Sequence, residues 1–482
     1  MKLSNLMKDI VFKGNLKNCD IKSISSDSKK SRHDSLFIAI KGDVYDGNAF
    51  IDEAISNGAI AIITEKKATV SSNIPVLQVK DSRLAMSQVC ARFYKNHSKN
   101  INVIGITGTN GKTSVAHILN HLMDSSKESC AVLGTLGLNT SNSNFNTVFT
   151  TPEPIELNKI IDTLIKTNIN NLIMEVSSHA LELHRIHNID FNIGVFTNLT
   201  EEHLDFHGTM DSYLNAKLKL FKKLNRHQHA IINLDDKFSK KFILSTKAKI
   251  VTYGFNKDAD ITILKSSFSM NGMKASIQIN NKIVSIETCL FGNYNLSNIM
   301  ASIATCICIG FPIKMIVKSL STLKPIPGRM EEISCSCPGK VFIDYAHTPD
   351  AFEKLLSTIT TIVDKKTKII SLFGCGGNRD YNNRSDIAKI SENYSDYIFI
   401  TTDNPRNENI DKINNDILKG FSNKNFSIIK NRKYAIETAL SKMEENSILL
   451  ILGKGREKFQ QIGKDKKYHS DVEIIKEYCY AS

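Results

Sequence analysis

Short apolar runs recur along the chain, separated by polar turns or by amphipathic segments. The first runs are bounded by Gly and Asp residues, which predicts a small α/β unit ending in the polar segment 94–100. They lie at 36–40, 59–63 and 76–79. From Ile101 onward the runs alternate with helix-like segments, as is typical of a mostly parallel sheet covered by helices on both faces. These runs lie at 103–106, 172–176, 193–196 and 230–233.

A later βαβ series begins after 325–329, where two prolines and a glycine interrupt a helical pattern. Its apolar runs lie at 341–343, 369–373, 397–400 and 448–452. Each run precedes a loop rich in charged or hydrogen-bonding side chains. Such loops are where open parallel sheets bind ligands, beyond the carboxyl ends of the strands. A chain of 482 residues also exceeds one ordinary core. We therefore expect an α/β protein with three domains: 1–98, a central doubly wound nucleotide-binding domain at 99–328, and 329–482 with a binding site of its own.

The segment 105–113 follows an apolar run and opens an amphipathic stretch that ends near Met123. Glycines let backbone N–H groups turn toward phosphate oxygens, Lys112 can neutralise the outer phosphates, and the Thr113 hydroxyl suits a magnesium ion. The strict nucleotide-loop pattern requires a glycine at the position of Ile106, so the spacing is a shortened variant. The alternative is a Gly-rich turn with an incidental lysine, but both flanks have the required strand and helix character. The sequence predicts a site for a nucleoside triphosphate.

Composition limits the classes of partner. A charge of +13 is compatible with nucleic acid or with phosphate-rich small substrates, but the basic residues are scattered among Asn and Ile and Trp is absent, so we expect no nucleic acid. Ten cysteines in a chain of this length indicate reduced thiols, and no nearby ligand completes a zinc pattern around Cys335 and Cys337. Without a signal-peptide core or a membrane-length apolar run, the protein is expected to be cytoplasmic with no membrane insertion.

Two strand ends carry candidate metal ligands. Glu175 ends one apolar run, and His203 and His207 follow the next one. Magnesium prefers oxygen ligands, so a histidine ligand would be unusual, and a zinc site made by the two histidines is less favoured than hydrogen bonding at a helix start.

Four motifs, in this order, resemble the Mur ligases, the ATP-dependent amino-acid-adding enzymes of peptidoglycan precursor synthesis. They are Gly108-Thr109-Asn110-Gly111-Lys112-Thr113, Glu175-Val176-Ser177-Ser178-His179, Asn198-Leu199-Thr200-x-x-His203-Leu204-Asp205 and Tyr213-Leu214-Asn215-Ala216-Lys217. The resemblance continues at 295–298, 328–331 and 344–351, and it spans nearly the whole chain. The tail motifs at 374–380, 403–406 and 453–457 resemble the family members that add meso-diaminopimelate.

The resemblance implies a fold, a reaction and its co-substrates. The C-terminal domain would be Rossmann-like, and the chain is expected to be a monomer. A carboxylate of UDP-N-acetylmuramoyl-L-alanyl-D-glutamate would attack the γ-phosphorus of ATP with Mg²⁺ as cofactor, and the amine of meso-diaminopimelate would displace phosphate from the acyl phosphate. No covalent enzyme nucleophile is needed, in agreement with the lack of a recognisable Ser-His-Asp or Cys-His arrangement.

The same resemblance assigns roles to individual residues. The catalytic residues would be Lys112, Glu175, His203 and Lys217, with Lys217 carbamylated so that a negative group faces the metal. Magnesium would be held by Thr113, Glu175 and His203. ATP would be held by Gly108, Thr109, Asn110, Gly111, Lys112, Thr113, Asn295, Arg329 and Asp344. The UDP-muramoyl-peptide would contact Ser28, Thr150, Thr151, Ser177 and Arg185. Diaminopimelate would be held by Arg379, Asp403, Asn404, Pro405, Arg406, Gly453 and Glu457.

Bland interpretations and rival functions stand beside these assignments. Lys217 could be a helical surface lysine, and Arg406 could pair with Asp403 or Glu408. Lys29, Leu183 and Arg456 depart from the family pattern, which puts individual substrate contacts in doubt. Folylpolyglutamate synthase shares the loop chemistry but should lack a uridine-binding first domain. A basic nucleic-acid-binding ATPase would need a clustered basic surface, and an inactive scaffold would have lost the catalytic set, which is intact here.

Overall fold

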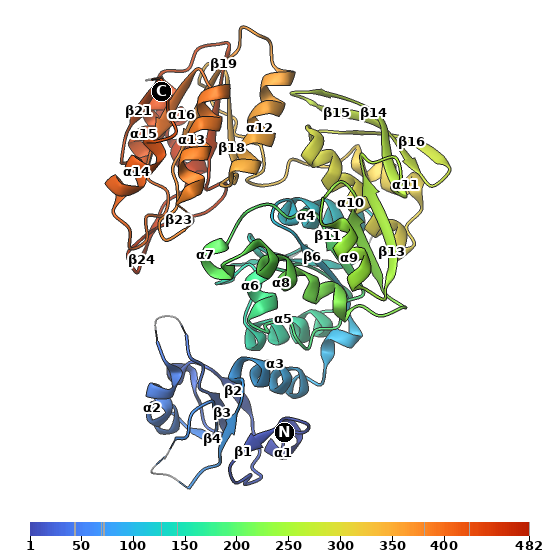
Figure 1. Ribbon diagram of the computed structural model, residues 1–482, viewed down its shortest axis with the longest axis vertical. Helices are drawn as coiled ribbons and strands as arrows, with labels where there is room; N and C mark the ends of the chain where they lie inside the picture. Colours follow the sequence, from blue (N-terminus) through green and yellow to red (C-terminus); the bar gives the residue numbers. More distant parts are fainter. Residues whose placement is uncertain are drawn as a thin grey trace.

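The computed structural model describes residues 1–42, 45–68, 70, 73–126, 128–141, 143–379, 381–423 and 425–481. Over these residues the chain forms three α/β domains that follow one another along the longest axis, from the blue N-terminal domain to the orange and red C-terminal domain (Figure 1). The expected α/β class is therefore confirmed. Asp380, which belongs to one of the tail motifs, lies outside the described residues.

The N-terminal domain is built on a mainly parallel sheet in the order β1-β5-β4-β3-β2, with β1 antiparallel to β5. The apolar runs of the sequence form its inner strands, because side chains such as Leu36, Ile63 and Leu77 are buried under the helices. Its elements are α1 (Leu3–Leu6), β1 (Phe12–Lys13), β2 (Ser23–Ser25), η1 (Ser28–Lys30), β3 (Ser35–Ile38), η2 (Gly47–Phe50), α2 (Ile51–Ser56), β4 (Ala59–Thr64), β5 (Val76–Val79), α3 (Ser82–Phe93) and η3 (His97–Asn100).

The central domain has a sheet in the order β16-β15-β14-β13-β12-β11-β6-β10-β7-β8-β9, parallel from β7 to β14. Ile104 of β6 packs in one core with helices α4, α10 and α11, whereas Val103 packs in the opposite core with α5 and α8. The sheet is therefore covered on both faces, as the alternation of runs predicts. Its first elements are β6 (Asn102–Thr107), α4 (Lys112–Asp124), β7 (Cys130–Gly134), β8 (Gly137–Thr140), β9 (Asn144–Phe145), α5 (Pro154–Lys166), β10 (Asn171–Glu175), α6 (Ser178–Glu182), β11 (Ile193–Phe196) and α7 (Leu204–His207).

An antiparallel meander, β14 to β16, extends this sheet, and the sequence analysis did not predict it. Figure 1 shows it reaching toward the C-terminal domain, where Phe268 and Met270 pack against the core that contains Phe352. The remaining central elements are α8 (Met210–Lys223), β12 (His229–Asn233), α9 (Ser239–Ser245), β13 (Lys249–Gly254), β14 (Ile261–Ser269), β15 (Gly272–Ile279), β16 (Lys282–Thr288), α10 (Asn293–Ile309) and α11 (Ile313–Leu320).

The C-terminal domain has a sheet in the order β17-β18-β22-β19-β20-β21, parallel from β18 to β21. Its predicted runs form β18, β19, β20 and β22, and a hairpin of β23 and β24 projects from it (Figure 1). Its elements are β17 (Glu331–Glu332), β18 (Lys340–Asp344), α12 (Pro349–Ile362), β19 (Lys368–Phe373), α13 (Asn382–Tyr394), β20 (Tyr397–Ile400), α14 (Ile410–Leu418), β21 (Phe426–Ile428), α15 (Arg432–Ser441), β22 (Ser447–Leu452), β23 (Phe459–Ile462), β24 (Asp465–Tyr468) and α16 (Asp471–Ala481).

Two further expectations from the sequence concern membrane-spanning helices and the state of the cysteines. No helix in the described parts of the chain is long and apolar enough to cross a membrane. The expectation of reduced thiols is wrong for Cys335 and Cys337, because Cys335 Sγ lies at bonding distance from the sulfur atoms of Cys337 and of Cys479 in α16. A separation of more than 140 residues hid that contact from any argument based on spacing.

Candidate active site

The phosphate loop lies between β6 and α4, in the shape that its glycines allow. Gly111 has φ +88°, and a Cβ atom there would lie 2.5 Å from Asn298 Oδ1. A Cβ at Gly108 would lie 1.9 Å from Thr197 Oγ1, so neither position tolerates a side chain. Asn198 braces the loop, since its Oδ1 accepts the Asn110 N–H (2.9 Å) and its carbonyl accepts the Thr109 N–H (2.9 Å).

Two lysines converge on this loop. Lys112 Nζ donates to the carbonyls of Gly108 (2.9 Å) and Thr109 (2.7 Å), and Lys217 Nζ donates to the same Gly108 carbonyl (2.9 Å). Lys217 is 1% exposed and lies 4.5 Å from the Tyr213 ring centroid, which excludes the surface-lysine interpretation. Burial, reinforced by the charge of Lys112, holds the pKa of Lys217 well below its usual value. The amine is therefore poised to be neutral.

Helix α8 contains a signal that could have revealed this burial. Lys217 follows Tyr213 by four residues and precedes Phe221 by four, so it lies on the stripe that packs against the sheet. A lysine in the centre of an apolar stripe is costly to bury, and its presence there indicates a chemical role.

Glu175 and Thr113 meet at the end of β10. Thr113 Oγ1 donates to Glu175 Oε1 (3.0 Å), and Thr135 donates to both carboxylate oxygens through its N–H (2.9 Å) and its hydroxyl (3.1 Å). Arg329 from the domain joint donates Nη2 to Thr113 Oγ1 (2.9 Å). The carboxylate and hydroxyl are hard oxygen donors of the kind that Mg²⁺ prefers, and both are held in place by neighbours.

His203 belongs to a neighbouring cluster that the sequence analysis only partly identified. Its Nε2 lies 3.6 Å from Glu202 Oε2, and Glu202 Oε1 lies 2.9 Å from His347 Nε2 of the C-terminal domain. Burial lowers the pKa of His203 to about 3, against the opposing pull of Glu202, so its ring is neutral and can act as a ligand. Glu202 and His347 lie inside motifs recognised in the sequence, but nothing in the sequence indicated that they pair.

Polar contacts hold the predicted ATP-binding residues on each side of the joint between the central and C-terminal domains. The Asp344 carboxylate accepts the N–H groups of Met330 (2.6 Å) and Ala346 (2.7 Å), and burial raises its pKa. The Arg329 guanidinium lies 4.7 Å from the Tyr345 ring centroid. Asn295 is buried at the start of α10, where its Nδ2 donates to the Phe291 carbonyl (3.0 Å). Of these predicted ATP contacts, Arg329 is the one that crosses the joint, since it donates to Thr113 of the central domain.

A pocket between these two domains is lined by Glu202, His203, Arg379, Arg406, Gly453 and Glu457, among others. Arg406 Nη1 donates to the Gly377 carbonyl (2.6 Å), and burial together with nearby Arg379 lowers its pKa. The Arg379 Nη1 lies 3.4 Å from His203 Nδ1. Among the described residues neither arginine makes an ion pair with a carboxylate within 4 Å. Two guanidinium groups therefore converge on the pocket with capacity for an incoming anion.

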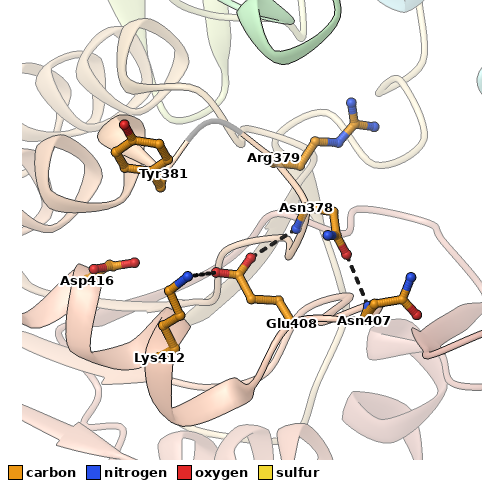
Figure 2. Close-up of a pocket in the computed structure, with 7 residues that line it drawn as sticks. All are labelled: Asn378, Arg379, Tyr381, Asn407, Glu408, Lys412 and Asp416. Atoms are coloured by element: carbon orange, nitrogen blue, oxygen red, sulfur yellow. Dashed lines mark hydrogen bonds and ion pairs between the residues drawn. The ribbon is translucent and has the colours of Figure 1, made fainter.

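Figure 2 shows a second pocket beside the loop that carries Arg379, lined by Asn378, Arg379, Tyr381, Asn407, Glu408, Lys412 and Asp416. Glu408 accepts the Asn378 N–H (3.0 Å) and lies 3.8 Å from Lys412, while the Arg379 side chain points away from both. Glu408 also pairs with Arg384 (2.7 Å). Arg406 is therefore not paired with Glu408, because Glu408 binds Arg384 and the loop backbone instead.

Another part of the pocket's lining is a hydrogen-bonded group that contains Glu457. Asn404 Nδ2 donates to Glu457 Oε2 (2.8 Å), and the fully buried Lys454 donates to Asn404 Oδ1 (3.2 Å) and to Glu457. A Cβ at Gly453 would lie 2.8 Å from Asp403 Oδ2, so glycine allows the two loops to approach. Lys454 was missed as a site residue, although it lies inside the recognised motif. Pro405 lies in the same loop, which β23 braces through the bond from the Arg406 N–H to the Gln461 carbonyl (3.0 Å).

Four of the five residues predicted to contact the UDP-muramoyl-peptide lie together in the central domain, and the fifth, Ser28, lies in the N-terminal domain. Thr151 accepts the Ser177 N–H (3.0 Å), and Arg185 Nη1 donates to the Thr151 carbonyl (3.1 Å). Thr150 Oγ1 lies 3.4 Å from Thr135 Oγ1, next to Glu175. Ser28 lies in the N-terminal domain, where its hydroxyl donates to Glu53 Oε2 (2.6 Å). Of the departures from the family pattern, Arg456 pairs with Glu331 of β17 (Nε to Oε2, 2.8 Å) within the C-terminal domain.

Three family models match the chain. They are the Mur ligase family, catalytic domain, at residues 20–94, the Mur ligase middle domain at 106–306, and the Mur ligase, glutamate ligase domain, at 328–455. The chain belongs to the Mur ligase family.

Relatives within the Mur ligase family match along their full length. A protein of Caldanaerobacter subterraneus subsp. tengcongensis, named UDP-N-acetylmuramoyl-L-alanyl-D-glutamate--2,6-diaminopimelate ligase, is 36% identical and covers 99% of this chain and 98% of its own. A Clostridium acetobutylicum protein of the same name, numbered 2, is 37% identical, with 99% of each chain covered. A solved structure of a ligase with that name has a TM-score of 0.68 and 30% identity, covering 96% of this chain and 95% of its own.

Folylpolyglutamate synthase of Mycobacterium tuberculosis shares the fold, with a TM-score of 0.64 and 16% identity, and covers 77% of this chain and 92% of its own. It thus leaves part of this chain unmatched, whereas the N-terminal segment 20–94 matches a Mur ligase model. Similarity at that level of identity concerns the fold alone.

Proposed function

We propose that the protein is an ATP-dependent ligase that joins meso-diaminopimelate to UDP-N-acetylmuramoyl-L-alanyl-D-glutamate through an acyl phosphate. The names of its full-length relatives support this reaction. The observation that carries the choice of amino acid is the pocket whose lining combines Arg379 and Arg406 with Asn404 and Glu457. An amino acid with two carboxylates and a distal ammonium suits this distribution of charge, because each guanidinium can clasp one carboxylate and Glu457 can accept from the ammonium.

The residues around the phosphate loop would handle ATP. Backbone N–H groups of 111–113, at the start of α4, would bind the phosphates, and Lys112 would leave its carbonyl partners to neutralise them. Thr113, Glu175 and the neutral His203 suit Mg²⁺, since two of them are hard oxygen donors and the third has a free ring nitrogen lone pair. When bound, Mg²⁺ would offset the charge that gathers on the transferred phosphoryl group. Asn295, Arg329 and Asp344 would hold the nucleotide across the joint.

Lys217 is proposed to carry a carbamate. Carbamylation begins when a neutral amine attacks carbon dioxide, and burial beside Lys112 favours that neutral form. The product places a negative group beside Lys112, and this negative group would attract the Lys112 ammonium. Such a group could orient a metal ion or Lys112 during phosphoryl transfer.

The first substrate would lie across two domains. Ser28 would contact the uridine part, and Thr150, Thr151, Ser177 and Arg185 would contact the muramoyl-peptide near Glu175. We also propose that the enzyme acts as a cytoplasmic monomer on these three small molecules, without nucleic acid.

The test is phosphate release from ATP by the purified protein. Release should require both the UDP-muramoyl-dipeptide and meso-diaminopimelate, and the product should gain the mass of one diaminopimelate residue. Equal release with L-lysine, or release without the dipeptide, would contradict the proposed reaction.

A further inference from the structure

Three cysteines meet at the edge of the C-terminal domain, and none of them is among the residues assigned to the proposed reaction. Cys335 and Cys337 lie in the segment between β17 and β18, and Cys479 lies in the last turns of α16. Their sulfur atoms all lie within 4.8 Å of one another, and all three residues are half-buried against the core that contains Ile475. The seven other cysteines of the chain, which all lie in its described part, form no disulfide.

Cys335 is the shared partner of this triad. Its Cα lies 5.3 Å from that of Cys337 and 5.5 Å from that of Cys479, and its Sγ contacts both other sulfurs. Both Cα separations lie inside the range that disulfides occupy. A cysteine sulfur forms only one disulfide, so these contacts correspond to two alternative bonds, each reachable without backbone movement.

The third thiol remains close to whichever bond forms. Cys337 Sγ and Cys479 Sγ lie 3.5 Å apart, and Ser336 Oγ donates to the Cys479 carbonyl (2.9 Å), which holds the segment 335–337 against the end of α16. A thiolate beside a disulfide can attack it and exchange partners. This geometry is that of an exchange site rather than of one fixed cross-link.

The two bonds differ in what they constrain. A bond between Cys335 and Cys337 closes a tight local loop, whereas a bond between Cys335 and Cys479 spans 144 residues and ties α16 to the segment before β18. The other end of α16 is already fixed, because Asp471 pairs with the fully buried Arg432 (2.7 Å). The long-range bond would therefore anchor the helix at both ends.

We propose that Cys335, Cys337 and Cys479 form a thiol–disulfide exchange site that reversibly locks α16 onto the C-terminal domain. In oxidation, two thiols of the triad give up two protons and two electrons to a small disulfide such as oxidised glutathione, which leaves as two thiols. In exchange, the Cys479 thiolate attacks Cys335 Sγ, a new S–S bond forms, and Cys337 leaves as a thiolate with no net oxidation.

The test uses the full-length protein, reduced and then treated with oxidised glutathione, with free thiols alkylated and peptides mapped by mass spectrometry. Wild type should lose two thiols per chain from this triad, with both Cys335–Cys337 and Cys335–Cys479 found. Cys337→Ser should give the long-range bond alone and Cys479→Ser the short one. Cys335→Ser should be oxidised at least about tenfold more slowly.

Thermal unfolding distinguishes a lock from an incidental pairing. Oxidised Cys337→Ser should melt on the order of 5 °C above its reduced form, because the bond closes a long loop in the unfolded chain. Oxidised Cys479→Ser should melt as its reduced form does. The proposal fails if the two variants shift equally, if oxidation falls on the other cysteines, or if the purified protein holds stoichiometric zinc or copper that keeps the triad from oxidation.

Discussion

Replacing Arg406 by alanine should raise the KM for meso-diaminopimelate and leave the constants for ATP and the UDP-dipeptide almost unchanged. Arg406 lines the pocket, and its guanidinium donates from one nitrogen to the Gly377 carbonyl. Nearby Arg379 adds a second positive charge and lowers the Arg406 pKa, so a carboxylate placed between them would relieve repulsion as well as form hydrogen bonds.

The expected size follows from this environment. Removing one partner of a buried, hydrogen-bonded charge pair costs about 2–5 kcal/mol, and Arg406 is partly rather than fully buried, so we take about 3 kcal/mol. Each 1.4 kcal/mol is roughly a factor of ten, so the KM should rise on the order of a hundredfold. Arg406→Lys keeps the positive charge but loses the planar guanidinium, so its KM should lie between those of wild type and Arg406→Ala.

The assay is phosphate release with the concentration of meso-diaminopimelate or of L-lysine varied. The preference for diaminopimelate over lysine should collapse in Arg406→Ala, because lysine lacks the carboxylate that the guanidinium is proposed to hold. Lys412→Ala is the matched control, because this cation lies beside Glu408 in the second pocket (Figure 2). Its removal should leave the preference for diaminopimelate over lysine unchanged. An Arg406→Ala enzyme that keeps its preference would refute the reasoning.

Three further predictions follow from single side chains. Lys112→Ala should abolish phosphate release, a loss of several kcal/mol in transition-state stabilisation, while circular dichroism and melting remain close to wild type; near-normal turnover would contradict the phosphate-loop assignment. Lys217→Ala should be inactive and regain part of its activity with added formate or acetate, whereas full activity without them would exclude a carbamate. Arg384 lowers the Glu408 pKa from 4.5 to about 2, so this pair stabilises the fold above pH 4.5 and is lost as pH falls toward 2. The stability gap between wild type and Glu408→Gln in urea titrations should therefore shrink over that range, and a constant gap would show that the pair is not responsible.

The parts of the site that sequence could predict are those carried by local pattern. The loop from Gly108 to Thr113 has strict conformational needs that only glycine meets, and the strands around it are continuous apolar runs. Apolar runs likewise located the inner strands of the first and third domains. The meander β14 to β16 was missed because its long strands alternate apolar and polar residues instead of forming such runs.

Contacts between segments distant in the chain could not be predicted from the sequence, for a different reason. The pairing of Glu202 with His347 and the meeting of Cys479 with Cys335 each join residues more than 140 positions apart. Helix and strand periods specify which face of an element is buried, but they carry no information about which distant face lies opposite it. Lys217 is the intermediate case, because its place on an apolar stripe was visible in the sequence and its Gly108 partner was not.

The hydrogen bonds already present in the phosphate loop determine what can enter it. Lys112 is bound to two backbone carbonyls, and the Thr113 hydroxyl is shared between Glu175 and Arg329. A ligand must therefore displace existing partners, and its net gain at each atom is the difference between two hydrogen bonds. A neutral hydroxyl or a single carbonyl offers Lys112 nothing better than what it has. Only a group with the charge density of a polyphosphate can form hydrogen bonds stronger than those it displaces. The loop therefore discriminates against nucleosides and sugars without any steric barrier.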